Sequence, residues 1–201
     1  RMFFQIELII AVVIAYLVGS ISSSIIIARF LNLPDPRTLG SGNPGATNML
    51  RTGSKKAAAF TLAGDLLKGL LPLIVARWLQ FDIQALCLMG LAAILGHLYP
   101  VDYRFTGGKG VATNLGVLLG IYWPLAIAWA LIWIAVARLS GFSSLAALIA
   151  TSILPPIAWF LRLPESIFYL MLAVMFLVIW RHRSKIKNLL TGNDAKIGTR
   201  E

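Results

Sequence analysis

Two glycine-rich segments that also carry polar and cationic side chains are the parts of this sequence best suited to chemistry. The first runs from Gly40 to Asn48, and the second runs from Thr106 to Gly110. Because glycine has no Cβ, its backbone N–H can approach a ligand closely, and successive N–H groups that point into one concavity form an anion site. The two segments therefore indicate a site for a phosphate-bearing substrate.

Cations in and after these segments favour the same chemistry. Arg51 follows the first segment and can make a bidentate contact with a phosphate, although an ordinary charge that flanks a membrane helix would look the same. Lys109 is surrounded by three glycines, and a surface charge does not need such flexible backbone. Lys109 is therefore the stronger candidate of the two.

Four other titratable residues have both a structural and a functional interpretation. Asp65 and Lys68 lie three residues apart in an apolar run, on one face of a helix. Such a buried pair fixes helix packing, or else Lys68 holds a substrate anion while Asp65 orients it. His97 fits an interfacial hydrogen bond or the site itself, because it is close to the second glycine-rich segment. His182 has the ring chemistry of a general base, or it belongs to the basic flank of the last helix.

The composition is that of a membrane protein with a single domain. Of the 201 residues, 58% are hydrophobic, and the formal net charge is +10. A soluble domain is much more polar, so we assign the positive charge to loops at an anionic membrane surface and not to nucleic-acid binding. No long polar linker divides the chain, and residues 1–201 are predicted to form one domain. The two histidines and one cysteine lack metal-site spacing, and we predict no metal and no other cofactor.

The expected fold is all-α, a polytopic membrane protein built as a bundle of seven transmembrane helices. Most apolar segments approach the ~20 residues that a bilayer crossing requires. They are Phe4–Ala28, Ala57–Leu79, Ile83–Tyr99, Val111–Tyr122, Trp123–Leu139, Phe142–Leu161 and Ser166–Trp180. The fourth segment is short, so it forms a half-span or joins the fifth through Trp123 and Pro124.

The distribution of lysine and arginine predicts the orientation of this bundle. With the N-terminus outside and seven crossings, 14 of the 18 lysine and arginine residues lie on the cytoplasmic side and three lie outside. Positive charge in short loops marks the cytoplasmic side. This topology places both glycine-rich segments and the basic C-terminal tail at the cytoplasmic face.

Several motifs resemble those of one enzyme family, in order along essentially the whole chain. Gly40–Asn48, with Pro36–Arg37 before it and Leu50–Gly53 after it, resembles the first signature of the bacterial acyl-phosphate:glycerol-3-phosphate acyltransferases, the PlsY family. Asp65–Gly69 is similar to the D-x-x-K-G of that family. The second signature resembles Gly96–Pro100 with Phe105–Thr113, and the third resembles His182–Ile186 with Leu189–Asp194.

Three residues depart from the pattern of the family. Lys185 stands where the family usually has Asn, Asp194 stands where it often has Glu, and Thr106 replaces a usual Lys. These departures concern the detailed role of the third signature more than the assignment.

The resemblance implies a membrane enzyme of bacterial phospholipid synthesis. Such an enzyme moves a fatty acyl group from acyl phosphate to the sn-1 hydroxyl of glycerol 3-phosphate, and its products are lysophosphatidate and inorganic phosphate. We expect a multi-pass protein of the bacterial cytoplasmic (inner) membrane, surrounded by membrane lipids, with its active site on the cytoplasmic side and no obligate protein partner.

The residues and the resemblance together predict the site. The expected catalytic residues are Ser41, Arg51, Lys109 and His182. The expected substrate-binding residues are Gly40, Gly42, Asn43, Gly45, Thr47, Asn48, Lys68, His97, Gly107, Gly108, Gly110, Arg183 and Lys185. The first segment is expected to hold acyl phosphate, while Arg51, Lys109 and the tail cations hold glycerol 3-phosphate, or the reverse. A substrate phosphate oxygen is preferred to His182 or His97 as the acceptor of the hydroxyl proton.

Two other classes of membrane protein use similar residues. A transporter of phosphate or organic anions would need the same cations, but the sequence has no second copy of the Gly40–Asn48 motif, and transporters often contain inverted repeats. A CDP-alcohol phosphotransferase would need clustered aspartates, whereas most of the eight acidic residues here are isolated. The acyltransferase interpretation is therefore favoured.

Overall fold

The computed structural model describes residues 2–51 and 54–197, and within these ranges the chain is helical and contains no β-strand. Thr52 and Gly53, which complete the first signature, lie outside the described residues. In chain order the α-helices are α1 (Met2–Ser20), α2 (Ser23–Phe30), α3 (Ala46–Arg51), α4 (Lys55–Trp78), α5 (Ile83–Leu98), α6 (Val111–Ser140), α7 (Ser143–Ser152), α8 (Leu154–Phe160), α9 (Glu165–Arg181) and α10 (Arg183–Leu190). Two short 3-10 helices, Pro36–Thr38 and Val101–Tyr103, lie in the loops.

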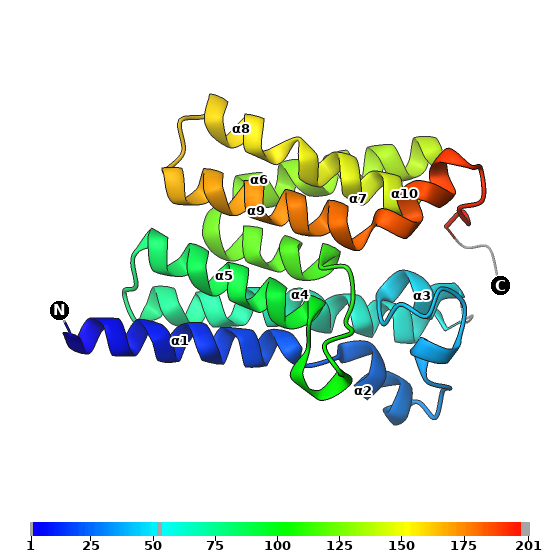
Figure 1. Ribbon diagram of the computed structural model, residues 1–201, viewed down its shortest axis with the longest axis horizontal. Coiled ribbons are helices and arrows are strands. Elements are labelled where there is room, and N and C mark those ends of the chain that lie inside the picture. The colour runs from blue at the N-terminus through cyan, green and yellow to red at the C-terminus, as the bar shows by residue number, and fades with distance from the viewer. Residues whose placement is uncertain (1, 52–53, 198–201) are drawn as a thin grey trace.

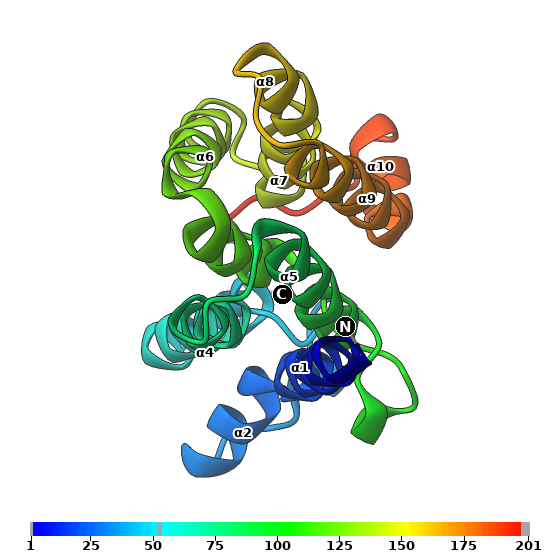
Figure 2. The same cartoon turned by 90° about the vertical axis from the view of Figure 1, so that its left-hand side faces the viewer.

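The long helices form one bundle whose axes lie roughly along a common direction (Figures 1 and 2). Helix α5 is central: it packs against α1 on one side and against α9 on the other, while α4 packs against α6 and α6 packs against α7. The core between them is apolar and includes Ala15, Leu73, Ile94, Leu118 and Met171. The outer faces are also apolar, and α1 alone exposes Ile9, Ile10, Val13, Ile14 and Leu17 by about half or more of their surface. Apolar residues on both the inside and the outside of a helical bundle are typical of a membrane protein.

Several helices are long and apolar enough to cross a membrane. Among the described residues, four single segments meet this condition: α4, α5 with the turn after it, α6, and α7 with α8. Two bent pairs also meet it, α1 with α2, which are inclined by 44°, and α9 with α10, which are inclined by 62°. The predicted class, an all-α polytopic membrane protein, is therefore confirmed.

Helix α6 contains a reversal at the boundary that the sequence suggested between its fourth and fifth apolar segments. Tyr122 has non-helical backbone (φ −154°, ψ 92°). Pro124, two residues later, lacks an N–H and therefore suits the first turn of the helical part that follows the break. The parts of α6 before and after Tyr122 run in opposite directions (Figure 1). Consistent with this, Val111 and Ser143 line the same cavity, although a straight helix of 30 residues would separate its ends by about 45 Å.

The first apolar segment, predicted over Phe4–Ala28, is formed by two helices with a bend between them. Helix α1 ends at Ser20, and α2 begins at Ser23 after the bend. The carbonyl of Ile21 accepts a hydrogen bond from Lys68 Nζ at 2.8 Å, and the Ser20 hydroxyl donates to the Tyr16 carbonyl at 3.0 Å. Side chains thus take part in the hydrogen bonding where the helix stops.

Close contact between α4 and the first half of α6 depends on two glycines. A Cβ at Gly69 would overlap the carbonyl oxygen of Thr113, and a Cβ at Gly116 would overlap the carbonyl oxygen of Leu66. Small residues let helix backbones approach closely in membranes, where van der Waals packing drives association. The beginning of α6 is therefore held directly against α4.

We predict that Gly69→Ala destabilises the protein by about 1–3 kcal/mol, because the added methyl group must push α6 away from α4. The measurement is the thermal unfolding temperature in detergent. Ala63→Val is the matched control, because Ala63 lies on the exposed face of the same helix. Equal unfolding temperatures for the two variants would contradict the close contact.

Candidate active site

A cavity of about 480 Å³ opens at the end of the bundle where both glycine-rich segments and the C-terminal tail meet. Its polar lining comes from segments that are far apart in the sequence. These lining residues are Ser41, Asn43, Thr47, Asn48, Arg51, Asp65, His97, Lys109, Ser143, Ser144, His182, Lys185 and Asp194. The placement of both glycine-rich segments at the same end of the bundle agrees with the expected topology.

The same cavity continues into an apolar part between α4 and α6. Its lining there is mostly alanine and leucine, with two tryptophans from the second half of α6. These residues are Leu50, Ala58, Ala59, Leu62, Val111, Ala112, Leu115, Trp129, Ala130, Trp133 and Ile134. One cavity thus combines a polar, cationic end with an apolar arm.

Asn48 organises the first glycine-rich segment from within. Its Oδ1 accepts hydrogen bonds from the Ser41 amide at 3.0 Å and from the Ser41 hydroxyl at 3.2 Å. Its Nδ2 donates to the carbonyls of Pro36 at 2.8 Å and Leu39 at 3.0 Å. Asn48 is 2% exposed, and its amide is used to shape the loop. The predicted substrate contact of Asn48 is therefore better understood as support for Ser41.

The second glycine-rich segment is attached to the end of α5. The amide of Gly107 donates to the Leu98 carbonyl and that of Gly108 to the His97 carbonyl, both at 3.1 Å. Arg181, at the end of α9, donates to the carbonyls of the same glycines, at 2.6 Å for Gly107 and 3.1 Å for Gly108. These two amides are thus engaged within the protein, in contrast to the anion contacts expected of them.

Glycine is required at position 108 for a packing reason. A Cβ there would overlap Nε2 of His97, whose side chain lies beneath the loop. The loop therefore fixes the position of Lys109 and of the beginning of α6. Lys109, Gly110 and Val111 all line the cavity. A helix N-terminus with a lysine beside it is a favourable place for an anion.

Three cations from three different elements face the cavity: Arg51 from α3, Lys109 from the second glycine-rich segment, and Lys185 from α10. Burial, together with the nearby positive charges of Lys185, Arg51 and Arg181, lowers the pKa of Lys109 from 10.5 to about 8, although Asp194 acts in the opposite direction. The site therefore holds positive charge that is poorly solvated and that an incoming anion would stabilise.

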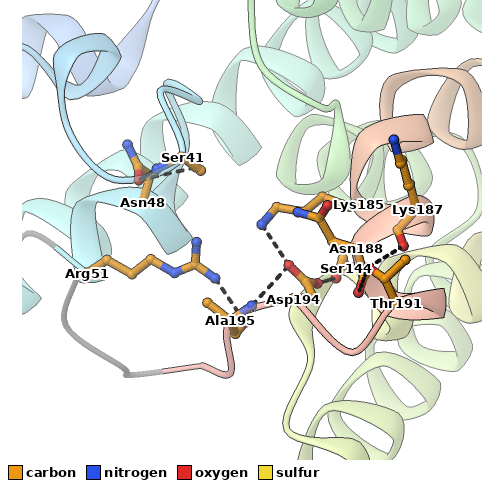
Figure 3. A network of polar contacts seen from close by, with 10 residues as sticks. All are labelled: Ser41, Asn48, Arg51, Ser144, Lys185, Lys187, Asn188, Thr191, Asp194 and Ala195. Atoms are coloured by element: carbon orange, nitrogen blue, oxygen red, sulfur yellow. Dashed lines mark hydrogen bonds and ion pairs between the residues drawn. The ribbon is translucent and has the colours of Figure 1, made fainter.

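Asp194 and the tail around it partly neutralise these cations (Figure 3). Lys185 Nζ lies 2.6 Å from Asp194 Oδ1, and the Ser144 hydroxyl donates to Asp194 Oδ2. Arg51 Nη2 donates to the Ala195 carbonyl at 3.0 Å. Burial by itself raises the pKa of the Asp194 carboxyl, but the hydrogen bonds from Lys185 and Ser144 and the nearby positive charges outweigh it and hold that pKa below its usual value.

The two histidines have different surroundings. His182 is 2% exposed, and its Nδ1 lies 2.8 Å from the Val178 carbonyl. That carbonyl only accepts, so Nδ1 carries the proton and Nε2 of a neutral ring is an acceptor. Asp65 Oδ1 lies 2.9 Å from Lys68 Nζ and 3.7 Å from His97 Nδ1. His97 and Lys68 therefore belong to a buried polar cluster beneath the second glycine-rich segment.

The structure brings all four predicted catalytic residues to the cavity, together with many of the predicted binding residues. The predicted residues that line it are Ser41, Arg51, Lys109, His182, Asn43, Gly45, Thr47, Asn48, His97, Gly110 and Lys185. Lys68, Gly107 and Gly108 instead border a small neighbouring space of about 10 Å³. Gly40, Gly42 and Arg183 line neither space, and Arg183 lies against the ring of Trp180.

Several residues of the site were not among the predicted site residues. In the sequence, Arg181 looks like an ordinary positive charge after an apolar helix. No neighbouring residue indicates its hydrogen bonds to the carbonyls of Gly107 and Gly108. Ser144 and Trp129 have no sequence signal either, because their roles follow from how α6 and α7 fold back over the cavity. Asp194 had one available signal, its place in the third signature.

Comparisons with known proteins identify the family. The family model for glycerol-3-phosphate acyltransferase matches residues 9–192. The chain is 52% identical over 189 residues to a glycerol-3-phosphate acyltransferase of Methylobacillus flagellatus, covering 93% of this chain and 95% of the relative. It is 48% identical to the protein of that name from Methylococcus capsulatus, covering 92% of this chain and 94% of the relative.

Solved structures agree with the sequence relatives. The crystal structure of PlsY, an integral membrane glycerol 3-phosphate acyltransferase, in its glycerol 3-phosphate form superposes with a TM-score of 0.90 at 37% identity over 96% of each chain. The lysophosphatidic acid form superposes with a TM-score of 0.89 at 36% identity, again over 96% of each chain. The chain belongs to the glycerol-3-phosphate acyltransferase family, of the PlsY type, as its motifs indicated.

We predict that the Lys109 amine titrates near pH 8 in the folded protein without substrate. Only the neutral amine reacts with an acylating reagent, so labelling of Lys109 should reach half its maximum near that pH. Inorganic phosphate should move the midpoint to higher pH, because an anion favours the ammonium form. Mass spectrometry of the labelled peptide gives the extent of reaction.

The unfolded protein is the control, because there the midpoint should return toward 10.5. If the folded and unfolded proteins gave the same midpoint, and phosphate moved neither, Lys109 would not be in a poorly solvated cationic site.

Proposed function

We propose that this protein transfers a fatty acyl group from acyl phosphate to the sn-1 hydroxyl of glycerol 3-phosphate, with lysophosphatidate and inorganic phosphate as products. The observation that carries the proposal is the single cavity that joins a cationic end to an apolar arm. One substrate is a water-soluble phosphate ester, and the other is a phosphate attached to a hydrocarbon chain. Both phosphates need cations, while the chain needs an apolar wall, and this cavity provides both.

The reaction requires orientation more than a strong nucleophile. The sn-1 hydroxyl oxygen bonds to the acyl carbon, the bond from that carbon to the phosphate oxygen breaks, and the electron pair leaves with phosphate. Acyl phosphate is an activated mixed anhydride, so the protein chiefly holds two anions in place and offsets the charge that develops on the carbonyl oxygen. Arg51, Lys109 and Lys185 are positioned for the phosphates, and Ser41 is held at the cavity wall by Asn48.

The hydroxyl proton goes to a phosphate oxygen of a substrate in this proposal. His182 Nε2 is an available acceptor beside the cavity, but the ring is enclosed and lies among cations, and both features oppose a second proton on it. The role assigned to His182 is a hydrogen bond that orients a substrate.

We further propose that the chain crosses the membrane seven times, with the N-terminus outside and the C-terminus and active site on the cytoplasmic side of the bacterial inner membrane. The reversal at Tyr122 supports this count, because the two halves of α6 then act as separate crossings beside α1, α4, α5, α7 with α8, and α9. The lysine and arginine distribution supports the orientation. A cytoplasmic opening would give glycerol 3-phosphate direct access from water.

Activity of the purified protein tests the proposal. In detergent, it should release phosphate from palmitoyl phosphate only when glycerol 3-phosphate is present, with lysophosphatidate formed in equal amount. A transporter would need sealed vesicles and would leave the anhydride intact. Absence of the reaction, with phosphate uptake into vesicles instead, would establish the transporter alternative.

Lys109→Ala should lower kcat/KM on the order of 100-fold or more, because it removes a fixed charge in a water-poor site. His182→Ala should cost less than about 100-fold, the lower end of what loss of a general base costs. Steady-state phosphate release with both substrates varied gives these values. The reverse order of the two effects would reject proton transfer to a substrate phosphate.

We predict that Asp194→Asn tightens binding of glycerol 3-phosphate roughly fivefold, or about 1 kcal/mol. Asp194 competes with a substrate phosphate for Lys185, and the neutral amide removes that competition. Calorimetric titration without the acyl donor measures the affinity. The same change in a Lys185→Asn background is the control and should have no effect, whereas weaker binding in both backgrounds would assign Asp194 a purely structural role.

A further inference from the structure

The apolar arm of the cavity has one wall made by the second half of α6. Trp129, Ala130, Trp133 and Ile134 line it, and their spacing places them on one face of that helix. The opposite wall is formed by alanines and leucines of α4 and of the beginning of α6. The arm is therefore a slot with small side chains along its length and indole rings on one wall.

Of the residues in the second half of α6 that line this slot, Trp129 is the one farthest along the helix from the polar part of the cavity. It precedes Ser140, the end of α6 beside the polar part of the cavity, by eleven residues, which corresponds to about 17 Å along a helix. Leu62 on α4 and Ile134 on α6 lie closer to the polar end, and they are 49% and 43% exposed. Both residues line the cavity and are also exposed on the outside of the bundle, so the cavity reaches the surface beside them, whereas Trp129 lines it from a buried position.

The Trp129 ring is fixed in place. Its Nε1 donates to the Thr151 hydroxyl at 3.0 Å, and the two residues are each 3% exposed. A buried indole whose N–H is satisfied has little freedom to turn aside. Trp129 therefore makes a rigid end wall.

We propose that Trp129, held by Thr151, terminates the binding slot for the acyl chain and thereby sets the longest acyl group that the enzyme uses efficiently. This inference rests on the proposed function, since the occupant of the slot is the hydrocarbon chain of the acyl donor. The slot suits that occupant because it is apolar, opens to the lipid, and joins the cations that would hold the donor's phosphate. A chain too long for the slot must bend or leave part of its length outside, and either loses contacts that shorter chains keep.

The test is the chain-length profile of the purified enzyme with acyl phosphates of increasing length, from lauroyl to stearoyl. Trp129→Ala should raise the ratio of kcat/KM for stearoyl over lauroyl phosphate about tenfold or more, the size of discrimination that added methylenes give in an apolar pocket. Ala130→Leu fills the slot and should lower the same ratio by a similar factor. Trp129→Phe keeps a ring at the end wall but loses the hydrogen bond to Thr151, so it should change the ratio less than Trp129→Ala does.

Trp123→Ala is the matched control, because Trp123 lies near the start of the same half-helix, is 62% exposed and does not line the cavity. It should not change the ratio. Because Trp129→Ala leaves Thr151 without its partner and can impair folding, Ala130→Leu provides an independent reading in the opposite direction.

Different results would contradict the role of Trp129 and the proposed function. If the unaltered enzyme transfers acyl groups but Trp129→Ala and Ala130→Leu both keep its chain-length profile, the inference is wrong. The acyl chain would then leave the cavity beside Leu62 and Ile134 and would not reach Trp129. If the unaltered enzyme transfers no acyl group of any length, the proposed function itself is wrong.

Discussion

The hydrogen bonds that tie Gly107 and Gly108 to the end of α5 and to Arg181 are the constraint on which the site depends. They use both the amides and the carbonyls of a segment that would otherwise have many conformations. Their result is that Lys109 and the first turn of α6 are presented to the cavity from a fixed position. Glycine is needed in this loop because His97 and α5 lie directly beneath it, so close packing is the reason for at least part of its glycine content.

The arrangement of charge follows from that fixed position. Arg51, Lys109 and Lys185 come from three segments and meet around one cavity, and their burial makes unpaired positive charge there costly. The tail offsets part of this cost, with the Asp194 carboxylate on Lys185 and the Ala195 carbonyl on Arg51. Under the proposed function, such internal acceptors stabilise the cations while the site is empty and can be exchanged for the phosphate groups of the substrates.

The reversal of α6 at Tyr122 connects the polar chemistry to the membrane. Its first half starts at Val111, just after Lys109, and packs on α4 through Gly69 and Gly116. Its second half returns with Trp129 and Trp133 to form the apolar arm. A single helix therefore contributes to both parts of the cavity. Under the proposed function, this arrangement lets one helix help to bind both the water-soluble and the lipid-soluble reactant.

Apolar length, the cations and motifs such as Gly40–Asn48 are local properties of the chain, so they can be recognised without the folded structure. They are enough to predict the class of the protein, the approximate apolar segments, and the types and spacing of the residues suited to chemistry. Which of these residues face the cavity depends on how the helices pack. In the folded protein, Asn48, Gly107 and Gly108 form their hydrogen bonds with other protein groups. Lys68 donates a hydrogen bond to the Ile21 carbonyl, and α1 ends at Ser20. The folded structure also adds four residues to the site that were not predicted: Arg181, Ser144, Trp129 and Asp194. These outcomes depend on contacts between residues far apart in the chain, and a hydrogen-bonding group that is satisfied by such a contact looks the same in sequence as one that is left for a substrate.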